Sequence, residues 1–250
     1  MTICAACGRE NSPDGSFCSA CGAALEEDDR AGETRKIVTV LFTDLVDSTP
    51  LAERLDPETL RHVMVRYFGA MQTTLERHGG TVEKFIGDAI MSVFGIPILH
   101  EDDALRGVRA AIDMRNTLAR LNDELEPEHG VRLSTRTGLN TGQVVAGDSS
   151  AQQKLATGDA VNVAARLEQA AGAGEILIGE ETERLVRHAV RLEPVDSLTL
   201  KGKSEPLPAW KALEIRPDVP AFTHPIAAPF VGRTHELEQL QDAFRQASLQ

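Results

Sequence analysis

The sequence predicts an α+β fold whose core follows the order β-α-β-β-α-β, the ferredoxin-like split βαβ arrangement. Residues 36–45 are rich in apolar and β-branched residues, as in a buried strand, and residues 83–95 place two short apolar runs around a Gly87-Asp88 pair, as in a tight hairpin. Two further segments repeat apolar residues at the three- and four-residue spacing of amphipathic helices. A strand-like segment after the second helix completes the order.

The first helix is expected between residues 49 and 75. Thr49 and Asp56 each precede a proline and are suited to cap a helix start. Apolar residues then recur with helical spacing, and the glycine pair at 79–80 is expected to end the helix.

A second amphipathic helix is expected over about residues 101–125, stopped by Pro127 and Gly130. Its acidic start could be mistaken for a metal cluster. Asp102 and Asp103 are instead typical of first-turn acids that complement the helix dipole.

The rest of the domain is predicted to be mixed. Residues 131–148 alternate like a strand, with a turn expected at 140–142 and a returning strand after it. A third helix is expected over 160–171. The remaining predicted strands lie near residues 175–178, 190–195, 198–201 and 208–213.

The composition is that of a globular protein, with 42% hydrophobic and 26% charged residues among 250. Lys and Arg number 26 against 38 Asp and Glu, so the net charge is −12. This balance disfavours nucleic acid as the main partner, because phosphate backbones attract a basic surface. No apolar run approaches the ~18 residues of a membrane span, and the N-terminus lacks a signal-peptide pattern. We therefore expect a cytoplasmic protein without a membrane segment.

The four cysteines form two pairs, Cys4-x-x-Cys7 and Cys18-x-x-Cys21, each followed by a glycine that lets the chain fold back. Four thiolates at this spacing are suited to a structural Zn²⁺ ion, as in a zinc ribbon. Two disulfides and a rubredoxin-like iron site share the spacing and remain alternatives, although a reducing cytoplasm disfavours disulfides. So short a segment holds almost no apolar core, so the metal would supply its folding energy.

Linkers separate the predicted domains. An acidic, unpatterned stretch follows the cysteines, and a proline-rich stretch follows Arg216. The final residues look like the entry to a P-loop ATPase domain of signalling type, whose remainder we expect beyond this chain. The predicted segments are a zinc ribbon (1–24), an acidic linker (25–34), the main domain (35–215), a proline-rich linker (216–229) and the start of an ATPase-like domain (230–250).

Two aspartates carry the predicted chemistry. Asp44 ends the buried first strand, where a carboxylate is costly unless it is paired or binds metal. Asp88 lies at the tip of the hairpin, which neighbours that strand in a split βαβ sheet. Two carboxylates from adjacent strands can hold two divalent cations for phosphoryl chemistry. Backbone N–H groups of Ser48 and Thr49, at the next helix start, are suited to phosphate oxygens. Each aspartate alone is weak evidence, because strand-end aspartates are usually caps.

A second polar pair lies on the third helix. Asn162 and Arg166 are four residues apart and therefore share a helix face. Taken alone, this pair is equally compatible with a solvated stripe.

Four motifs in order resemble the catalytic domain of class III adenylate/guanylate cyclases. They are "LFTDLVDST", "EKFIGDAIMSVFG", "TGDAVNVAARLEQ" and "LKGKSEP". The resemblance covers about residues 35–215. A zinc ribbon before this domain and an ATPase opening after it resemble large bacterial regulators of the family.

The resemblance implies a role for each site residue. Asp44 and Asp88, with the Leu45 carbonyl, would ligate two Mg²⁺ or Mn²⁺ ions. Asn162 would orient the ribose, and Arg166 would stabilise the charge on the α-phosphoryl group. Lys201, in the last of the four motifs, would bind the terminal phosphates. Family enzymes form head-to-tail dimers, so a homodimer would carry two composite sites.

The resemblance also implies base selection by Lys84, which donates to a ring nitrogen of adenine. Lysine has only donors, which suits adenine N1 and not the guanine N1–H. The second base-selecting position of the family falls on Leu155, which cannot read the amino group, so discrimination between ATP and GTP is expected to be relaxed. Asp47 stands where many relatives have glycine and adds a negative charge beside the phosphate-binding turn.

The sequence therefore predicts an adenylate cyclase that converts ATP to 3′,5′-cyclic AMP and pyrophosphate. The alternative is a cyclase-like module that binds nucleotide and regulates an attached ATPase. Modules of that kind usually lack a metal aspartate, the asparagine or the arginine, and all four are present here. A DNA-binding regulator would rest on the zinc ribbon alone and is opposed by the net charge.

Overall fold

The computed structural model describes residues 2–4, 6–12, 17–23, 34–146, 156–198, 206–217 and 234–247. The chain divides into two compact units, Met1–Val219 and Pro220–Gln250. Within the described residues, no helix is long and apolar enough to cross a membrane.

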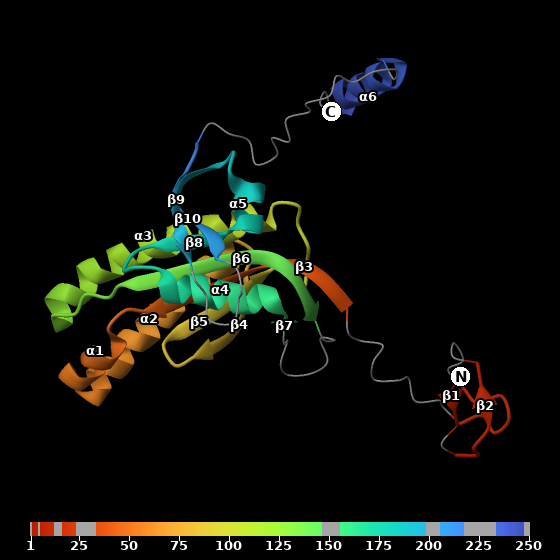
Figure 1. Cartoon of the computed structure of the whole chain (residues 1–250), viewed down its shortest axis with the longest axis horizontal. Helices are drawn as coiled ribbons and strands as arrows, with labels where there is room; N and C mark the ends of the chain where they lie inside the picture. The colour runs from red at the N-terminus through yellow and green to blue at the C-terminus, as the bar shows by residue number, and fades with distance from the viewer. Residues whose placement is uncertain are drawn as a thin grey trace. The chain divides into compact units, whose positions relative to one another are not determined.

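The first unit is built on one large sheet (Figure 1). Its first half has the strand order β4-β5-β3-β6, in which β5 separates β3 from β4 and is antiparallel to both. This is the split βαβ order, and it confirms the predicted α+β fold. The strands are β3 (Thr34–Leu45), β4 (Thr81–Ile86), β5 (Ala89–Phe94) and β6 (Thr135–Ala146).

The second half of the sheet extends the core beyond β6. Strand β8 pairs with β6 in parallel, β10 pairs with β8, and β9 forms the edge. The two strands predicted over 190–195 and 198–201 are a single strand up to residue 198, and residues 199–205 lie outside the described part. The short strand β7 (Ala156–Thr157) pairs with the other end of β6. The strands beyond β6 are β8 (Ile176–Gly179), β9 (Val190–Leu198) and β10 (Leu207–Ile215).

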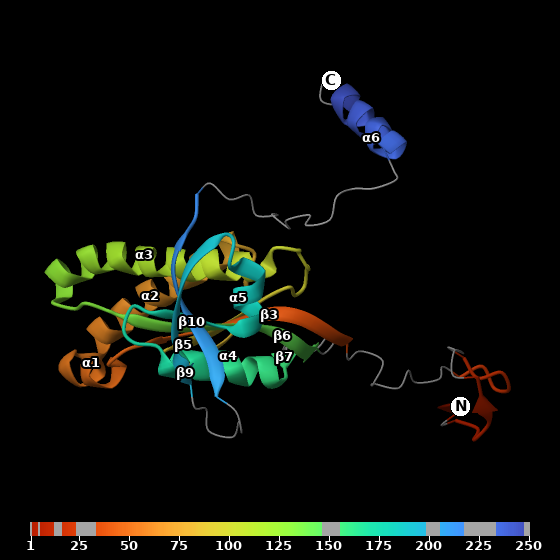
Figure 2. The same cartoon turned by 45° about the horizontal axis from the view of Figure 1, so that its top comes forward.

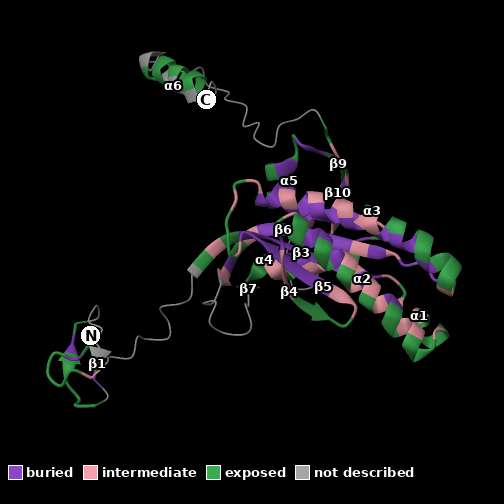
Figure 3. Ribbon diagram, turned by 180° about the vertical axis from the view of Figure 1, so that it is seen from behind, coloured by how far each residue is buried: buried purple, intermediate pink, exposed green. Residues whose placement is uncertain are grey.

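Helices cover both faces of the sheet (Figure 2). Helices α2 and α3 pack on one face and α4 on the other. Alternate residues of β3 serve the two faces: Val38, Val40 and Phe42 pack toward α4, whereas Thr39 lies against α3. Buried residues accordingly run along the strands (Figure 3). The helices are α1 (Ser48–Arg54), α2 (Pro57–Arg77), α3 (Asp103–His129), α4 (Asp159–Ala170), α5 (Glu180–Val186) and α6 (Thr234–Ala247).

Strand β6 corrects one prediction. The turn expected at 140–142 does not exist, because β6 runs unbroken from Thr135 to Ala146 and pairs with β3 along its whole length. Its glycines serve packing instead of turning. A Cβ on Gly138 would lie 2.2 Å from the Glu168 backbone nitrogen, and one on Gly142 would lie 2.9 Å from the Ala160 Cβ. Both glycines let α4 approach the strand closely.

Helix starts were predicted with mixed success. Asp56 caps α2 as expected, with its side chain accepting a hydrogen bond from the Thr59 N–H at 2.9 Å. Thr49 does not cap α1; it lies inside the helix, whose N-cap is Asp47. Asp47 adopts a left-handed conformation (φ 59°), which explains why a glycine is suited to this position.

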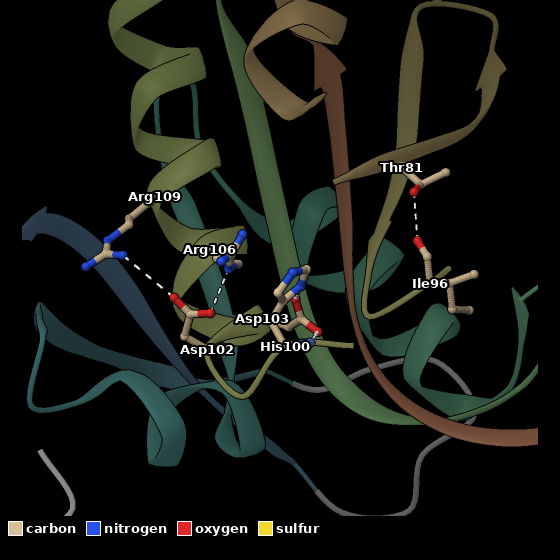
Figure 4. A network of polar contacts seen from close by, with 7 residues as sticks. All are labelled: Thr81, Ile96, His100, Asp102, Asp103, Arg106 and Arg109. Carbon is tan, nitrogen blue, oxygen red and sulfur yellow. Dashed lines mark hydrogen bonds and ion pairs between the residues drawn. The ribbon is translucent and has the colours of Figure 1, made fainter. Parts of the chain in front are cut away.

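Helix α3 is longer than predicted. It passes through Pro127 and ends at Gly130, whose φ is 64°. Polar contacts at its start confirm that the acids there are structural (Figure 4). Asp102 binds Arg106 at 2.6 Å and Arg109 at 3.9 Å, and Asp103 accepts a hydrogen bond from the His100 backbone N–H. In the same view, the Thr81 hydroxyl donates to the Ile96 carbonyl at 2.7 Å.

Two small parts stand outside the sheet. The N-terminal segment pairs β1 (Thr2–Ile3) with β2 (Glu10–Asn11). In the second unit the described element is α6, whose Leu240 and Phe244 side chains are exposed.

Candidate active site

Asp44 and Asp88 lie at the same end of adjacent strands. Strand β3 pairs with β5 so that Thr43 faces Ile90, which places Asp44 one residue further along β3. Asp88 follows Gly87 (φ 64°) in the two-residue turn between β4 and β5. Both aspartates are partly buried. Carboxylates and a neighbouring backbone carbonyl are donors that Mg²⁺ and Mn²⁺ prefer, so these residues fit a divalent cation.

An arginine contacts one of these aspartates. Arg136 of β6 is paired in register with Asp44, and its Nη2 lies 2.8 Å from the Asp44 Oδ2. The Nε of the same guanidinium lies 2.6 Å from Oε1 of Glu168 on α4. Arg136 therefore bridges two carboxylates that come from different elements.

This bridge between Arg136 and the two carboxylates is partly buried, and the pKa values of Glu168 and Arg136 are shifted. The Glu168 side chain is 8% exposed, and burial raises the pKa of its carboxyl while Arg136 opposes that shift. The hydrogen bond to Asp44 raises the pKa of Arg136. A buried charge of this kind is tolerated only because it is paired.

Neither Arg136 nor Glu168 was predicted as a site residue. One signal was present: Glu168 is a charged residue among the apolar positions of α4 that face the sheet. Arg136 precedes Gly138 by two residues and so lies on the same strand face, which is the face that α4 covers. The close approach at Gly138 places Glu168 beside it.

Tyr67 of α2 lies near the same carboxylates. Its side chain is 0% exposed, and among the described residues its hydroxyl has no hydrogen-bond partner. Burial raises its pKa, and the charges of Asp44 and Asp88 raise it further. The hydroxyl of Tyr67 therefore lies near enough to both carboxylates for their charges to act on it.

The polar residues of α4 do not reach these aspartates within one chain. Asn162 is exposed and Arg166 partly buried, on the side of α4 away from its buried residues. In the described part of the chain, no hydrogen bond or ion pair joins either residue to Asp44 or Asp88. Glu168 is the α4 residue that connects to Asp44, through Arg136.

The remaining predicted site residues are only partly described. Ser48 and Thr49 form the first turn of α1, and Lys84 is exposed on β4 at an irregularity in its pairing with β5. Leu155 and Lys201 lie outside the described residues.

Two cavities lie elsewhere in the first unit. One of about 590 Å³ lies beside the start of α4, and its lining includes Asn140 and Asp159. Another of about 580 Å³ lies near the start of β3, and its lining includes Lys36 and His100. Asp44 and Asp88 line neither cavity.

The four cysteines converge in the N-terminal segment. Their Sγ atoms all lie within 4.8 Å of one another, and no disulfide joins them. The two halves repeat one turn, in which a glycine N–H donates to the carbonyl of Cys4 (2.7 Å) or Cys18 (2.9 Å). Both glycines, Gly8 and Gly22, have a positive φ (73° and 69°), which is a conformation that glycine adopts readily in a tight turn.

The thiols of this cluster have opposed pKa shifts. Backbone N–H groups of Ala20 and Cys21 lower the pKa of Cys18 to about 6. The Arg9 N–H lowers the pKa of Cys7, but neighbouring thiols outweigh it and raise the value to about 12. Four thiolates held this closely repel one another unless a cation joins them.

Proteins named as cyclases are similar to this chain in sequence and in fold. The family model for the adenylate and guanylate cyclase catalytic domain matches residues 31–210 of the sequence. Adenylate cyclase 1 of Rhizobium meliloti is 28% identical over 187 residues, which are 72% of this chain and 28% of that protein. An adenylate cyclase of Mycobacterium bovis is 32% identical over 167 residues, which are 66% of this chain and 37% of that protein. The chain thus spans about a third of these curated relatives.

Solved structures show the same fold. The adenylyl cyclase CyaB from P. aeruginosa superposes with a TM-score of 0.71 at 32% identity, covering 75% of this chain and 99% of that one. The guanylyl cyclase Cya2 gives 0.69 at 30% identity, covering 75% and 96%. Relatives named for either nucleotide are therefore similar to this chain, which belongs to the adenylate and guanylate cyclase family.

Proposed function

We propose that the chain is an adenylate cyclase that converts ATP to 3′,5′-cyclic AMP and pyrophosphate. The observation that carries this is the placement of Asp44 and Asp88 at one end of adjacent strands, in a domain of the cyclase family. In the reaction, the ribose 3′-hydroxyl gives its proton to water and its oxygen attacks the α-phosphorus in line. The bond between the α-phosphorus and the oxygen that joins it to the β-phosphorus breaks, and pyrophosphate leaves with that oxygen.

The residues of this chain bind and orient the nucleotide. Asp44, Asp88 and the Leu45 carbonyl would hold two Mg²⁺ or Mn²⁺ ions, which activate the 3′-hydroxyl and neutralise the triphosphate. The exposed Lys84 ammonium donates to a ring nitrogen of adenine. Arg166 stabilises charge on the α-phosphoryl group, and a guanidinium is suited to this because its planar fork matches phosphate oxygens.

Other residues complete the proposed nucleotide site. Asn162 orients the ribose, and Lys201 binds the terminal phosphates. The first turn of α1, at Ser48 and Thr49, offers backbone N–H groups to phosphate oxygens. Leu155 contacts the base without reading its amino group, so GTP is expected as a weaker second substrate.

The proposed site is composite and needs a second copy of the chain. Within one chain, no hydrogen bond or ion pair among the described residues joins Asn162 or Arg166 to Asp44 or Asp88. A head-to-tail homodimer brings Asp44 and Asp88 of one copy to Asn162 and Arg166 of the other. Each dimer then has two sites.

Product formation tests the assignment. The purified chain is incubated with Mn²⁺ and ATP or GTP, and cyclic nucleotide and pyrophosphate are measured beside Asp44→Ala and Arg166→Ala. We expect cyclic AMP from wild type and its loss in both variants. If nucleotide binds but no product forms at any metal or protein concentration, a regulatory nucleotide-binding module is the better account.

We also propose that Cys4, Cys7, Cys18 and Cys21 hold one structural Zn²⁺ ion. The convergence of the four Sγ atoms supports this, because tetrahedral thiolate sites are typical of zinc. Metal analysis should give one zinc per chain and none in a Cys18→Ser variant. Two disulfides would instead give no free thiols in the absence of reductant, and iron would give a coloured protein.

A further inference from the structure

The guanidinium of Arg136 contacts the Asp44 carboxylate, which the proposed metal site also uses. Its Nη2 is 2.8 Å from the Asp44 Oδ2, and its Nε is 2.6 Å from the Glu168 Oε1. The exposed fractions of the three side chains are 18% for Asp44, 33% for Arg136 and 8% for Glu168. One permanent cation is thus shared between two carboxylates of limited solvent access.

A divalent cation and this guanidinium cannot both use Asp44 without cost. Both are attracted to the same carboxylate and repel each other, and partial burial weakens solvent screening of that repulsion. Glu168 offers the guanidinium a second partner. The backbone of Glu168 packs closely against β6, because a Cβ on Gly138 would lie 2.2 Å from the Glu168 backbone nitrogen.

We propose that the Arg136–Glu168 pair sets the affinity of the site for divalent cations. Arg136 competes with the ion for Asp44, and Glu168 holds the guanidinium when the ion takes that carboxylate. Both are positioning residues in this role, acting on a metal ligand. The inference rests on the proposed assignment of Asp44 as a metal ligand.

A double-mutant cycle tests the pair. Mn²⁺ affinity of the full chain is measured without nucleotide, by calorimetry, for wild type, Arg136→Gln, Glu168→Gln and the double variant, with Asp44→Asn as the blank. Loss of the competing charged hydrogen bond should tighten Mn²⁺ binding about tenfold in Arg136→Gln. Glu168→Gln should weaken Mn²⁺ binding several-fold, because Arg136 then loses its second carboxylate partner and competes more strongly with the ion for Asp44.

The cycle separates a direct pair from a general charge effect. If Glu168 acts through Arg136, the Glu168→Gln change has little effect once position 136 is glutamine. If Glu168 contributes only its charge, Glu168→Gln weakens Mn²⁺ binding by the same factor whether position 136 is arginine or glutamine. That result overturns the inference. Equal or weaker binding by Arg136→Gln overturns it as well.

Folding and the metal assignment are controlled separately. Arg136→Gln alone leaves Glu168 buried without a partner, so thermal melting is recorded for each variant. The double variant removes both charges and should fold and bind Mn²⁺ more tightly than wild type; binding no tighter than wild type refutes the pair. If Asp44→Asn binds Mn²⁺ like wild type, the metal assignment of the proposed function fails instead.

Discussion

Replacing Gly138 by alanine probes the contact on which the α4 side of the site depends. An added Cβ would lie 2.2 Å from the Glu168 nitrogen and 2.4 Å from the Ala164 carbonyl oxygen, both backbone atoms. This is about 1 Å short of an ordinary contact, so the helix must move away from β6. Overpacking against backbone should cost about 3 kcal/mol, the upper part of the usual range.

The assay is thermal unfolding with a matched control. A cost of about 3 kcal/mol lowers the Tm of a domain of this size by roughly 6–12 °C. Gly69→Ala is the control, since Gly69 lies in α2 with nothing within 4 Å of an added Cβ. That variant should gain about 0.5–1 kcal/mol, because alanine is the better helix former.

Turnover should fall with stability in Gly138→Ala. Helix α4 carries Asn162 and Arg166, and a displacement of about 1 Å can cost roughly 100-fold in rate. Cyclic AMP formation is measured well below the Tm. An unchanged Tm for Gly138→Ala, alongside the expected rise for Gly69→Ala, would show that α4 does not lie this close to β6.

Three further changes have definite expected outcomes. Lys84→Glu replaces donors by acceptors, so the ratio of ATP to GTP turnover should fall about tenfold or more, and an unchanged ratio would remove Lys84 from base selection. Tyr67→Phe removes a buried hydroxyl that has no hydrogen-bond partner in the described part of the chain, so the variant should melt no lower than wild type; a clear loss of stability would mean that the hydroxyl is satisfied. Asp56→Ala removes the α2 cap. The Thr59 N–H lowers the pKa of Asp56 below its usual 3.8, so the cap stabilises above that pH and is lost as pH falls through the lowered value. The Tm difference from wild type should therefore shrink below pH 3.8, and a difference independent of pH would contradict a charged cap.

Local signals in the sequence predicted local structure well. The hairpin was predicted from Gly87-Asp88 because a tight turn needs such residues, and Asp56 from the chemistry of helix caps. The turn at 140–142 was wrong, because a glycine required for close packing has the same appearance in a sequence as one required for a turn. Pro127 was wrong as a stop, because α3 continues through it to His129 and it is Gly130, in the left-handed conformation, that caps the helix.

The polar bridge could not be predicted in this way. Arg136 and Asp44 are separated by 92 positions, and Glu168 comes from a third element. Their meeting depends on the register between β3 and β6 and on the approach of α4 at Gly138. Both are properties of packing and not of local spacing. The predicted split βαβ order nevertheless placed Asp44 and Asp88 on neighbouring strand ends, where the register has them.

Mixing two inactive variants tests the central proposal most directly. Asp44→Ala and Arg166→Ala are purified separately, each expected to be inactive, then mixed and assayed for cyclic AMP with Mn²⁺ and ATP. If the site is shared between two copies, each mixed dimer keeps one intact site, and activity should return to about a quarter of wild type. Two inactive variants that stay inactive after subunit exchange, shown by a labelled subunit, would contradict a composite active site.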